Sequence, residues 1–296
     1  RPAGPRSKET LAYLNDDIRP RLEQVPDEIA NILVGLDGRF VPAGPSGAPT
    51  RGMANILPTG RNFYSVDIRA IPSHTACEVG RRAAEGVLEK YLDETGDYPR
   101  SIGMVVWGTS NMRTSGDDIG EILHLMGVRP VWQGINRRVI GIEVIPLDEL
   151  GRPRIDVLVR ISGFFRDAFP NVVEMIDEAV RTVAALDEPP EMNFIKANIA
   201  KEIAGGGDPE SAAWRVFGSK PGSYGAGLLN LIDERNWTTD KDLADVYVAW
   251  GGYAYGKEAP GVAAFGAFRR RLSGVNVAVH NQDNREHDIF DSDDYF

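Results

Sequence analysis

The stretch from Ile102 to Ser110 decides the fold, and it reads Ile102-Gly103-Met104-Val105-Val106-Trp107-Gly108-Thr109-Ser110. A short uncharged run of this kind, without polar alternation, is typical of a strand buried on both faces in a parallel sheet. A helix is expected to open near Gly116-Asp117-Asp118, because acidic residues are favoured in the first helical turn. A strand followed by a helix is the repeating unit of α/β proteins.

Outward from this strand, the pattern continues in both directions. Residues 76–95 predict a helix, with an apolar stripe at spacings of three and four. Further strands are expected at 129–132, 139–145 and 155–161. Helices are then expected at 171–187, 193–204, 208–217, 223–235, 240–255 and 260–272, before a last strand at 275–279. The prediction is an α/β fold with a doubly wound, mostly parallel sheet followed by a mainly helical lobe.

The N-terminal part predicts less regular structure. Residues 1–30 predict a helical lead-in, and residues 31–41 predict a hairpin turning at Asp37-Gly38. The Gly- and Pro-rich stretch 42–60 is typical of either disorder or a functional loop. We therefore expect three segments: 1–95 with the hairpin and the Gly/Pro-rich loop, 96–190 as the α/β unit, and 191–296 as the helical lobe.

Composition excludes several classes of function. The 296 residues are 42% hydrophobic and 26% charged, with a formal net charge of -10. Such an acidic chain is a poor binder of nucleic acid, which requires a basic surface. Cys77 is the single cysteine, so no internal disulfide can form. We find no signal peptide and no apolar run near the roughly 20 residues of a membrane span, which predicts a soluble, cytoplasmic protein. Because the chain starts at Arg1 and stops on Tyr295-Phe296, we expect a truncation at both ends.

The segment after the last predicted strand is the most unusual in composition. Residues 280–294 hold two of the four histidines, His280 and His287, together with carboxylates that include Asp288 and Asp291. Imidazole and carboxylate groups suit a divalent transition metal, and they equally suit proton transfer near neutral pH. A solvated acidic loop that caps the sheet is the structural alternative.

Several arginines are candidates for binding an anionic ligand. Arg51 and Arg61 lie in Gly- and Pro-rich loops, and Arg113 lies where a strand end meets a helix N-terminus. Arg160 and Arg166 flank a Phe-rich stretch whose rings could face a flat ligand. The alternatives are solvated surface arginines and core phenylalanines.

Lys220 lies in a Gly-rich stretch, residues 215–227, that superficially suggests a phosphate loop. The lysine precedes the glycine cluster and is followed by proline, so the Gly-x-x-x-x-Gly-Lys-Ser/Thr order is absent. No such run occurs elsewhere in the chain, and we do not expect it to bind ATP for hydrolysis.

Eight segments, in order along the chain, carry a resemblance to a known family. They are residues 45–52, 57–64, 107–109, 112–114, 160–167, 217–225, 250–256, and 280–288 with 290–295. Together they resemble the large subunit of cobaltochelatase, a relative of the magnesium chelatase H subunit. The run His280-Asn281-Gln282-Asp283-Asn284-Arg285-Glu286-His287-Asp288 points to the cobalt branch, and the family subunit is several times longer than this chain.

The resemblance implies insertion of Co2+ into hydrogenobyrinic acid a,c-diamide, with ATP hydrolysed by AAA+ partner subunits and not bound here. On this hypothesis, Arg51, Arg61, Arg113, Arg166 and Lys220 bind the anionic macrocycle. Catalytic roles fall to His280, His287 and Asp288, and metal binding falls to His280, His287 and Asp291.

Three other interpretations stay open. The chain could be a non-catalytic module that binds the tetrapyrrole or docks the ATPase, or part of a magnesium chelatase H-type subunit. A self-sufficient metallohydrolase built on residues 280–294 is the third.

Overall fold

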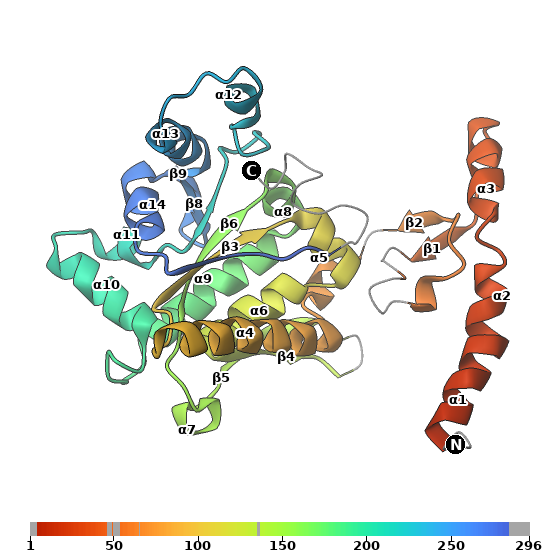
Figure 1. The fold of residues 1–296 in the computed structure, drawn as a ribbon, viewed down its shortest axis with the longest axis horizontal. Coiled ribbons are helices and arrows are strands. Elements are labelled where there is room, and N and C mark those ends of the chain that lie inside the picture. The colour runs from red at the N-terminus through yellow and green to blue at the C-terminus, as the bar shows by residue number, and fades with distance from the viewer. Residues whose placement is uncertain (1–4, 46–48, 50–53, 65, 135–136, 284–296) are drawn as a thin grey trace. The chain divides into compact units, whose positions relative to one another are not determined.

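A computed structural model of the chain describes residues 5–45, 49, 54–64, 66–134 and 137–283. The chain divides into two compact units (Figure 1). The first comprises Arg1–Val66 with Met112–Thr114, and the second comprises Asp67–Asn111 with Ser115–Phe296.

The first unit begins with helices, as predicted for its first 30 residues. They are α1 (Pro5–Tyr13), a π-helical turn (Leu14–Ile18), α2 (Arg19–Leu22) and α3 (Asp27–Leu36). The predicted hairpin at 31–41 is wrong, because α3 occupies most of it. Asp27 and Glu28 stabilise the first turn of α3 through the helix dipole. Gly38 does turn the chain, at a φ of 69°, but it turns it just after a helix.

The Gly- and Pro-rich stretch is partly ordered. Within it, β1 (Ala43–Pro45) pairs in parallel with β2 (Asn62–Tyr64), and a 3-10 helix forms at Ala54–Ile56. The described residues of this stretch are thus ordered, and the interpretation as a functional loop stays a prediction.

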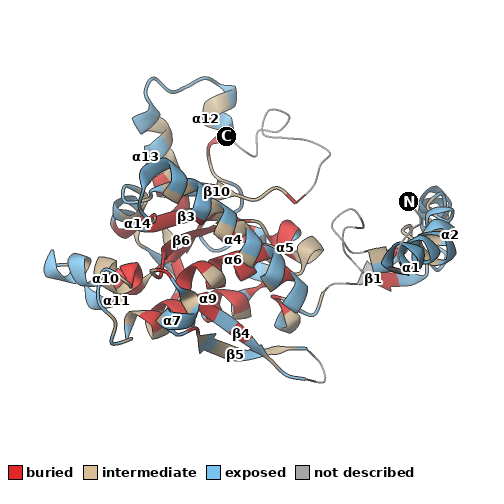
Figure 2. Ribbon diagram, turned by 60° about the horizontal axis from the view of Figure 1, so that its bottom comes forward, coloured by how far each residue is buried: buried red, intermediate tan, exposed pale blue. Residues whose placement is uncertain are grey.

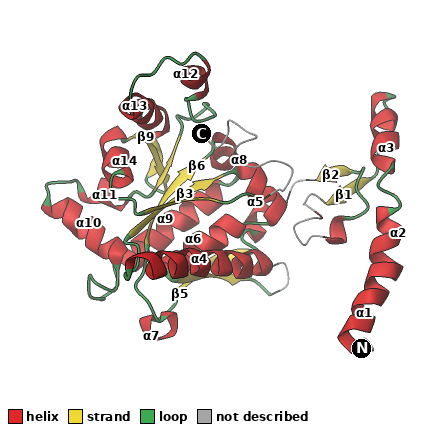
Figure 3. Cartoon of the chain, viewed as in Figure 1, coloured by secondary structure: helices red, strands yellow, loops and turns green. Residues whose placement is uncertain are grey.

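The second unit is built on a six-stranded sheet, drawn in yellow in Figure 3, with strand order β10-β3-β6-β7-β8-β9. The strands β10, β3, β6 and β7 run parallel to one another. The strand β8 is antiparallel to its neighbours β7 and β9 on either side. Their bounds are β3 (Ser101–Val106), β6 (Asp156–Ile161), β7 (Val216–Gly218), β8 (Tyr253–Gly256), β9 (Ala259–Ala263) and β10 (Val277–His280). This confirms an α/β fold with a mostly parallel sheet.

Helices and one hairpin complete the second unit. The helices are α4 (His74–Thr95), α5 (Gly108–Thr114, of which Gly108–Asn111 belong to this unit), α6 (Asp117–Met126), α7 (Leu147–Leu150), α8 (Gly163–Ala168), α9 (Pro170–Ala184), α10 (Phe194–Ala204), α11 (Pro209–Ala213), α12 (Leu229–Asp233), α13 (Asp240–Gly251) and α14 (Phe265–Leu272). The strands β4 (Val128–Trp132) and β5 (Val139–Val144) pair antiparallel in a sheet of their own. Residues 129–145 therefore form a hairpin outside the main sheet.

The predicted helical lobe is the main correction to the fold. Residues 191–283 contribute β7, β8, β9 and β10 to the same sheet as β3 and β6, so they form no separate lobe. The segments predicted as helices at 208–217, 240–255 and 260–272 each contain both a helix and a short strand. In strands this short, the alternation of apolar and polar residues cannot be distinguished from the apolar spacing of the adjoining helix.

Helices pack on both faces of the sheet, and the most deeply buried elements lie between them (Figure 2). On one face α6 and α9 contact β6 and β7, and α4 packs on α6. The contact between α4 and α6 uses glycines, since a Cβ at Gly80 would lie 2.3 Å from the Glu121 amide nitrogen. On the other face, α13 and α14 enclose a core around Leu158, Phe217 and Phe268. No helix in the described residues is both long and apolar enough to cross a bilayer.

Candidate functional site

A pocket of ≈ 340 Å³ opens at the carboxyl ends of the parallel strands β10, β3 and β6. Open α/β sheets bind their ligands at this edge. The walls combine apolar residues with a few polar groups, as in small-molecule sites. The lining residues that matter below are Trp107, Arg160, Tyr247 and His280, with Leu228, Leu229 and Ile232 from the chain around α12.

Strand register explains why these side chains meet. His280 on β10 pairs with Val105 on β3, and Val105 pairs with Arg160 on β6. Paired residues in adjacent strands point to the same face of a sheet. His280 and Arg160 are two strands apart, about 10 Å at the backbone. Val105 lies between them and lines the floor of the pocket.

Arg160 is a buried cation without a carboxylate partner among the described residues. Its side chain is 8% exposed, and its Nε has no hydrogen-bond partner. Nη1 donates to the Ile161 carbonyl, and the guanidinium carbon lies 5.6 Å from the centre of the Tyr247 ring. Burial lowers the pKa of Arg160 below its usual value. A buried charge without a counterion is costly, so this group favours an anionic ligand.

His280 lies at the opposite side of the pocket and contacts Trp107. The indole Nε1–H of Trp107 donates to Nε2 of His280 at 2.8 Å, and the two rings lie 6.1 Å apart at an interplanar angle of 25°. Nε2 must be unprotonated to accept this bond, which places the proton of the neutral ring on Nδ1.

Arg166, predicted to bind substrate, is fully engaged within the protein. It forms a bidentate ion pair with Asp167, at 2.7 and 2.9 Å. Its Nη1 donates to the carbonyls of Ser219, Lys220 and Ser223, which fixes that loop. The hydrogen bonds that Arg166 donates to the Asp167 carboxylate raise the pKa of Arg166. These contacts indicate that Arg166 stabilises the loop at residues 219–223.

The other predicted residues are dispersed or lie outside the described residues. Arg61 donates to the carbonyls of Pro58 and Ile56, at 3.0 and 2.8 Å, and so stabilises its own loop in the first unit. Lys220 is exposed, and Arg113 lies half-buried near the end of α5. Four predicted residues lie outside the described ranges, namely Arg51, His287, Asp288 and Asp291.

Within the described ranges, no group of three or more His, Cys, Asp or Glu side chains is placed to hold a metal ion. The predicted roles in metal binding for His280, His287 and Asp291 therefore stay predictions.

Two residues of the pocket are absent from the set of substrate-binding residues predicted from the sequence. Arg160 is named there as a candidate beside Arg166, but the prediction chooses Arg166, and Tyr247 on α13 is not named at all. A signal for Arg160 was present, because an arginine interrupts the apolar run Val157-Leu158-Val159 before Ile161. A charged residue in a strand buried along its whole length is a candidate for function. Nothing in the sequence marks Tyr247.

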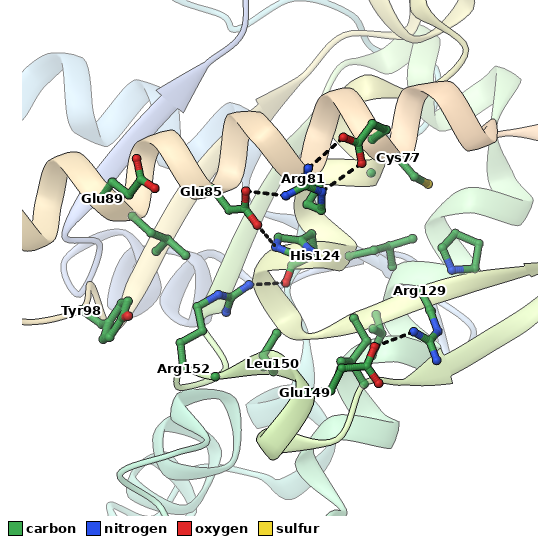
Figure 4. A pocket seen from close by; sticks show the side chains of 18 of the residues that line it. Cys77, Arg81, Glu85, Glu89, Tyr98, His124, Arg129, Glu149, Leu150 and Arg152 are labelled. Carbon is green, nitrogen blue, oxygen red and sulfur yellow. Dashed lines mark hydrogen bonds and ion pairs between the residues drawn. The ribbon is translucent and has the colours of Figure 1, made fainter.

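A second pocket, of ≈ 600 Å³, lies between α4, α6 and the β4–β5 hairpin. Figure 4 shows that several of its charged side chains point at one another, among them Arg81 at Glu85 and Arg129 at Glu149. Arg81 pairs with Glu85 at 2.5 Å, and Arg129 pairs with Glu149 at 2.8 Å. Burial, followed by the charge of Arg152, lowers the pKa of His124 to about 4. Most of these charges are paired with one another, and the buried guanidinium of Arg152 donates to the carbonyls of His124, Leu125 and Pro153. We therefore rank this pocket below the one at Arg160.

Comparison with known proteins identifies the family. A family model described as CobN/Magnesium Chelatase matches residues 2–296. The aerobic cobaltochelatase subunit CobN of Pseudomonas aeruginosa is 50% identical over 98% of this chain, and the H subunit of magnesium chelatase from Chlorobaculum parvum is 37% identical over 91%. The chain spans 24% and 21% of these two proteins.

A solved structure shows the same fold. The structure described as the catalytic subunit of cobaltochelatase from Mycobacterium tuberculosis matches 98% of this chain with a TM-score of 0.93 and 56% identity. The chain covers 25% of that protein. With the family model matching nearly its whole length, this chain belongs to the CobN/Magnesium Chelatase family.

Proposed function

We propose that the chain is part of the tetrapyrrole-binding subunit of an ATP-dependent metal chelatase that inserts Co2+ into hydrogenobyrinic acid a,c-diamide. The cobalt branch is favoured by identity, at 50% to a cobaltochelatase subunit against 37% to a magnesium-chelatase subunit. A magnesium chelatase H-type role is the alternative within the same family.

The observation that carries the proposal is the environment of Arg160. A tetrapyrrole of this class combines a flat, largely apolar ring system with peripheral carboxylates. The pocket offers the complement: a guanidinium without a carboxylate partner among the described residues lies against the ring of Tyr247, and the ring of Trp107 lines the same pocket. A carboxylate on Arg160 gains a charge-assisted hydrogen bond, and the aromatic side chains cover the ring system.

The size of the pocket limits this role to one part of the macrocycle. A volume of ≈ 340 Å³ lies at the lower end of the range of about 300–1,000 Å³ for small-molecule sites. We therefore assign this chain one wall of the site, which receives an edge of the macrocycle. The alternative of a binding module, with the chemistry completed by other parts of the longer subunit, is compatible with this wall.

Metal insertion must also remove two pyrrole N–H protons, and His280 is the described residue best placed to accept one. Its Nε2 is occupied by the Trp107 indole, but a neutral hydrogen bond contributes only about 0.5–1.5 kcal/mol. A bound substrate can therefore displace the indole. Contributions of His287, Asp288 and Asp291 to metal delivery are part of the same proposal. So are contacts of Arg51, Arg61, Arg113 and Lys220 with the macrocycle.

ATP hydrolysis belongs to partner subunits in this account. The chain has no Gly-x-x-x-x-Gly-Lys-Ser/Thr run, so AAA+ partners are proposed to bind and hydrolyse the nucleotide.

The test is a titration of the chain with hydrogenobyrinic acid a,c-diamide, followed by absorption of the macrocycle, with and without Co2+. We expect saturable binding that does not require the metal, and a loss of affinity in Arg160→Met. Arg129→Gln is the matched control, because it removes an exposed guanidinium in the β4–β5 hairpin. Equal binding by wild type and Arg160→Met would remove the observation on which the proposal rests.

A further inference from the structure

The buried carboxyl group of Asp118 contacts both segments of chain that carry Trp107 and His280. Asp118, in the first turn of α6, is 3% exposed. Its Oδ2 accepts from Nδ2 of Asn111 at 2.8 Å, and its Oδ1 accepts from Nδ2 of Asn281 at 2.9 Å. Asn111 lies in α5, the helix that follows β3, and Asn281 directly follows β10. One carboxylate therefore links the helix after β3 to the end of the neighbouring strand β10.

Both asparagines reach the residues that meet in the pocket. Nδ2 of Asn111 also donates to the carbonyl of Trp107 at 2.8 Å. Asn281 is the neighbour of His280, and side chains alternate along a strand, so its side chain reaches the α6 face while His280 faces the pocket. The Asp118 contacts therefore restrain both halves of the Trp107–His280 hydrogen bond from the opposite face of the sheet.

The position of Asp118 in a helix is not sufficient to explain these contacts. An acidic residue in the first turn is favoured by the helix dipole, and the half-buried Asp117 beside it fits that explanation. The dipole accounts neither for the burial of Asp118 nor for its two asparagine partners.

Glu121 is the second carboxyl group near Asn281. Its Oε2 accepts from Nδ2 of Asn281 at 2.5 Å. Burial raises the pKa of Glu121 to about 7, and the charges of Asp118 and Asp117 add to the shift. Glu121 thus retains its proton through much of the acidic range.

We propose that Asp118 is a positioning residue of the pocket: through Asn111 and Asn281 it orients Trp107 and His280 so that the indole N–H binds Nε2 of His280. The orientation selects one tautomer of the imidazole, with its proton on Nδ1. It also presents the ring to a ligand in a fixed direction. Polar partners behind a functional histidine set its tautomer and orientation in this manner.

The first test measures the tautomer of His280 by 15N NMR of the chain at pH 8, with the signal assigned by His280→Gln. We expect wild type to show the Nδ1–H form and Asp118→Asn, of nearly the same shape, to show a mixture of both forms. Asp117→Asn is the matched control and is expected to leave the tautomer unchanged. An Nε2–H ring in wild type, or an unchanged tautomer in a folded Asp118→Asn chain, would overturn the proposal.

A second variant keeps the test decisive if Asp118→Asn does not fold. Asn281→Ala removes one arm of the bridge at a half-buried position, and it is expected to give the same mixture of tautomers. A single Nδ1–H tautomer in Asn281→Ala would contradict the role of the bridge.

The consequence for ligand binding rests on the proposed function. If the pocket receives the macrocycle, Asp118→Asn weakens its binding by about tenfold, the lower range for loss of a supporting polar partner. A changed tautomer with unchanged macrocycle affinity would support the positioning role and contradict the macrocycle site. An unchanged tautomer contradicts the positioning role whatever the affinity is.

Discussion

The guanidinium of Arg160 lies against the ring of Tyr247, with 5.6 Å between the guanidinium carbon and the ring centre. A cation–π contact of this kind contributes about 0.5–2 kcal/mol. That is less than the several kcal/mol needed to desolvate a charged group. The contact with Tyr247 therefore does not offset the cost of burying the Arg160 charge. A ligand carboxylate would supply the missing stabilisation, which is the physical reason to assign an anion to this pocket.

Removing the Arg160 charge is expected to leave the folded chain at least as stable as wild type. Arg160→Met keeps an unbranched side chain of similar length and removes a buried cation that has no carboxylate partner among the described residues. Urea denaturation of both proteins measures this. A decrease in the free energy of unfolding of several kcal/mol would show that Arg160 has a structural role instead.

Arg166→Met is expected to have the opposite effect on stability. The substitution leaves the carbonyls of Ser219, Lys220 and Ser223 without their guanidinium donor and breaks the ion pair with Asp167. We expect the free energy of unfolding to fall by about 2 kcal/mol. Urea denaturation of Arg166→Met and Arg160→Met, measured side by side, compares their free energies of unfolding. Equal values would contradict the conclusion that Arg166 stabilises the fold and Arg160 does not.

Glu121 is expected to make the chain less stable as the pH rises. Its pKa is about 7 in the folded chain against a usual value of 4.5, so the folded state binds more protons between these values. The free energy of unfolding therefore falls from pH 4.5 to pH 7, by on the order of 3 kcal/mol from this group. Glu121→Gln mimics the protonated form and should remove this contribution when unfolding is measured at pH 5 and pH 8.

His124 is expected to have the opposite effect on the pH dependence of stability. Its pKa is about 4 in the folded chain against a usual 6.5, so the unfolded state binds more protons in this window. Stability is lost as the pH falls from 6.5 to 4, again by on the order of 3 kcal/mol.

The contributions of Glu121 and His124 to the pH dependence of the free energy of unfolding have opposite signs and partly cancel in wild type. Variants that remove one group at a time should reveal each contribution separately. His124→Gln should leave a chain that becomes more stable on acidification, while Glu121→Gln should leave one that becomes less stable. Identical pH profiles for the two variants would contradict both assignments.

The parts of the fold that the sequence predicts are those with a long, uniform pattern. The apolar runs at 102–106 and 155–161 form β3 and β6, because each is buried along most or all of its length. The strand β7 was missed because Val216-Phe217-Gly218 is short and adjoins a helix. Its pairing partners on β6 lie 57 residues earlier in the chain, since Val216 pairs with Val159. No local sequence pattern reveals a pairing over this distance.

The site shows the same limit. Arg160 and Arg166 occur in one Phe-rich segment, and the sequence does not distinguish them. The loop carbonyls that engage Arg166 come from Ser219 to Ser223, 53 to 57 residues later. Only tertiary structure shows that one guanidinium is used internally and the other has no carboxylate partner in the described residues.

The most direct test of the macrocycle site compares two ligands on two proteins. Hydrogenobyrinic acid a,c-diamide and the same macrocycle with its carboxylates esterified are titrated against wild type and Arg160→Met. A charge-assisted hydrogen bond is worth about 1.5–3 kcal/mol, or roughly 10- to 150-fold in affinity. The account predicts that wild type prefers the free acid by about this factor and that Arg160→Met loses the preference. A preference of the same size in both proteins would place the carboxylate elsewhere and contradict the account.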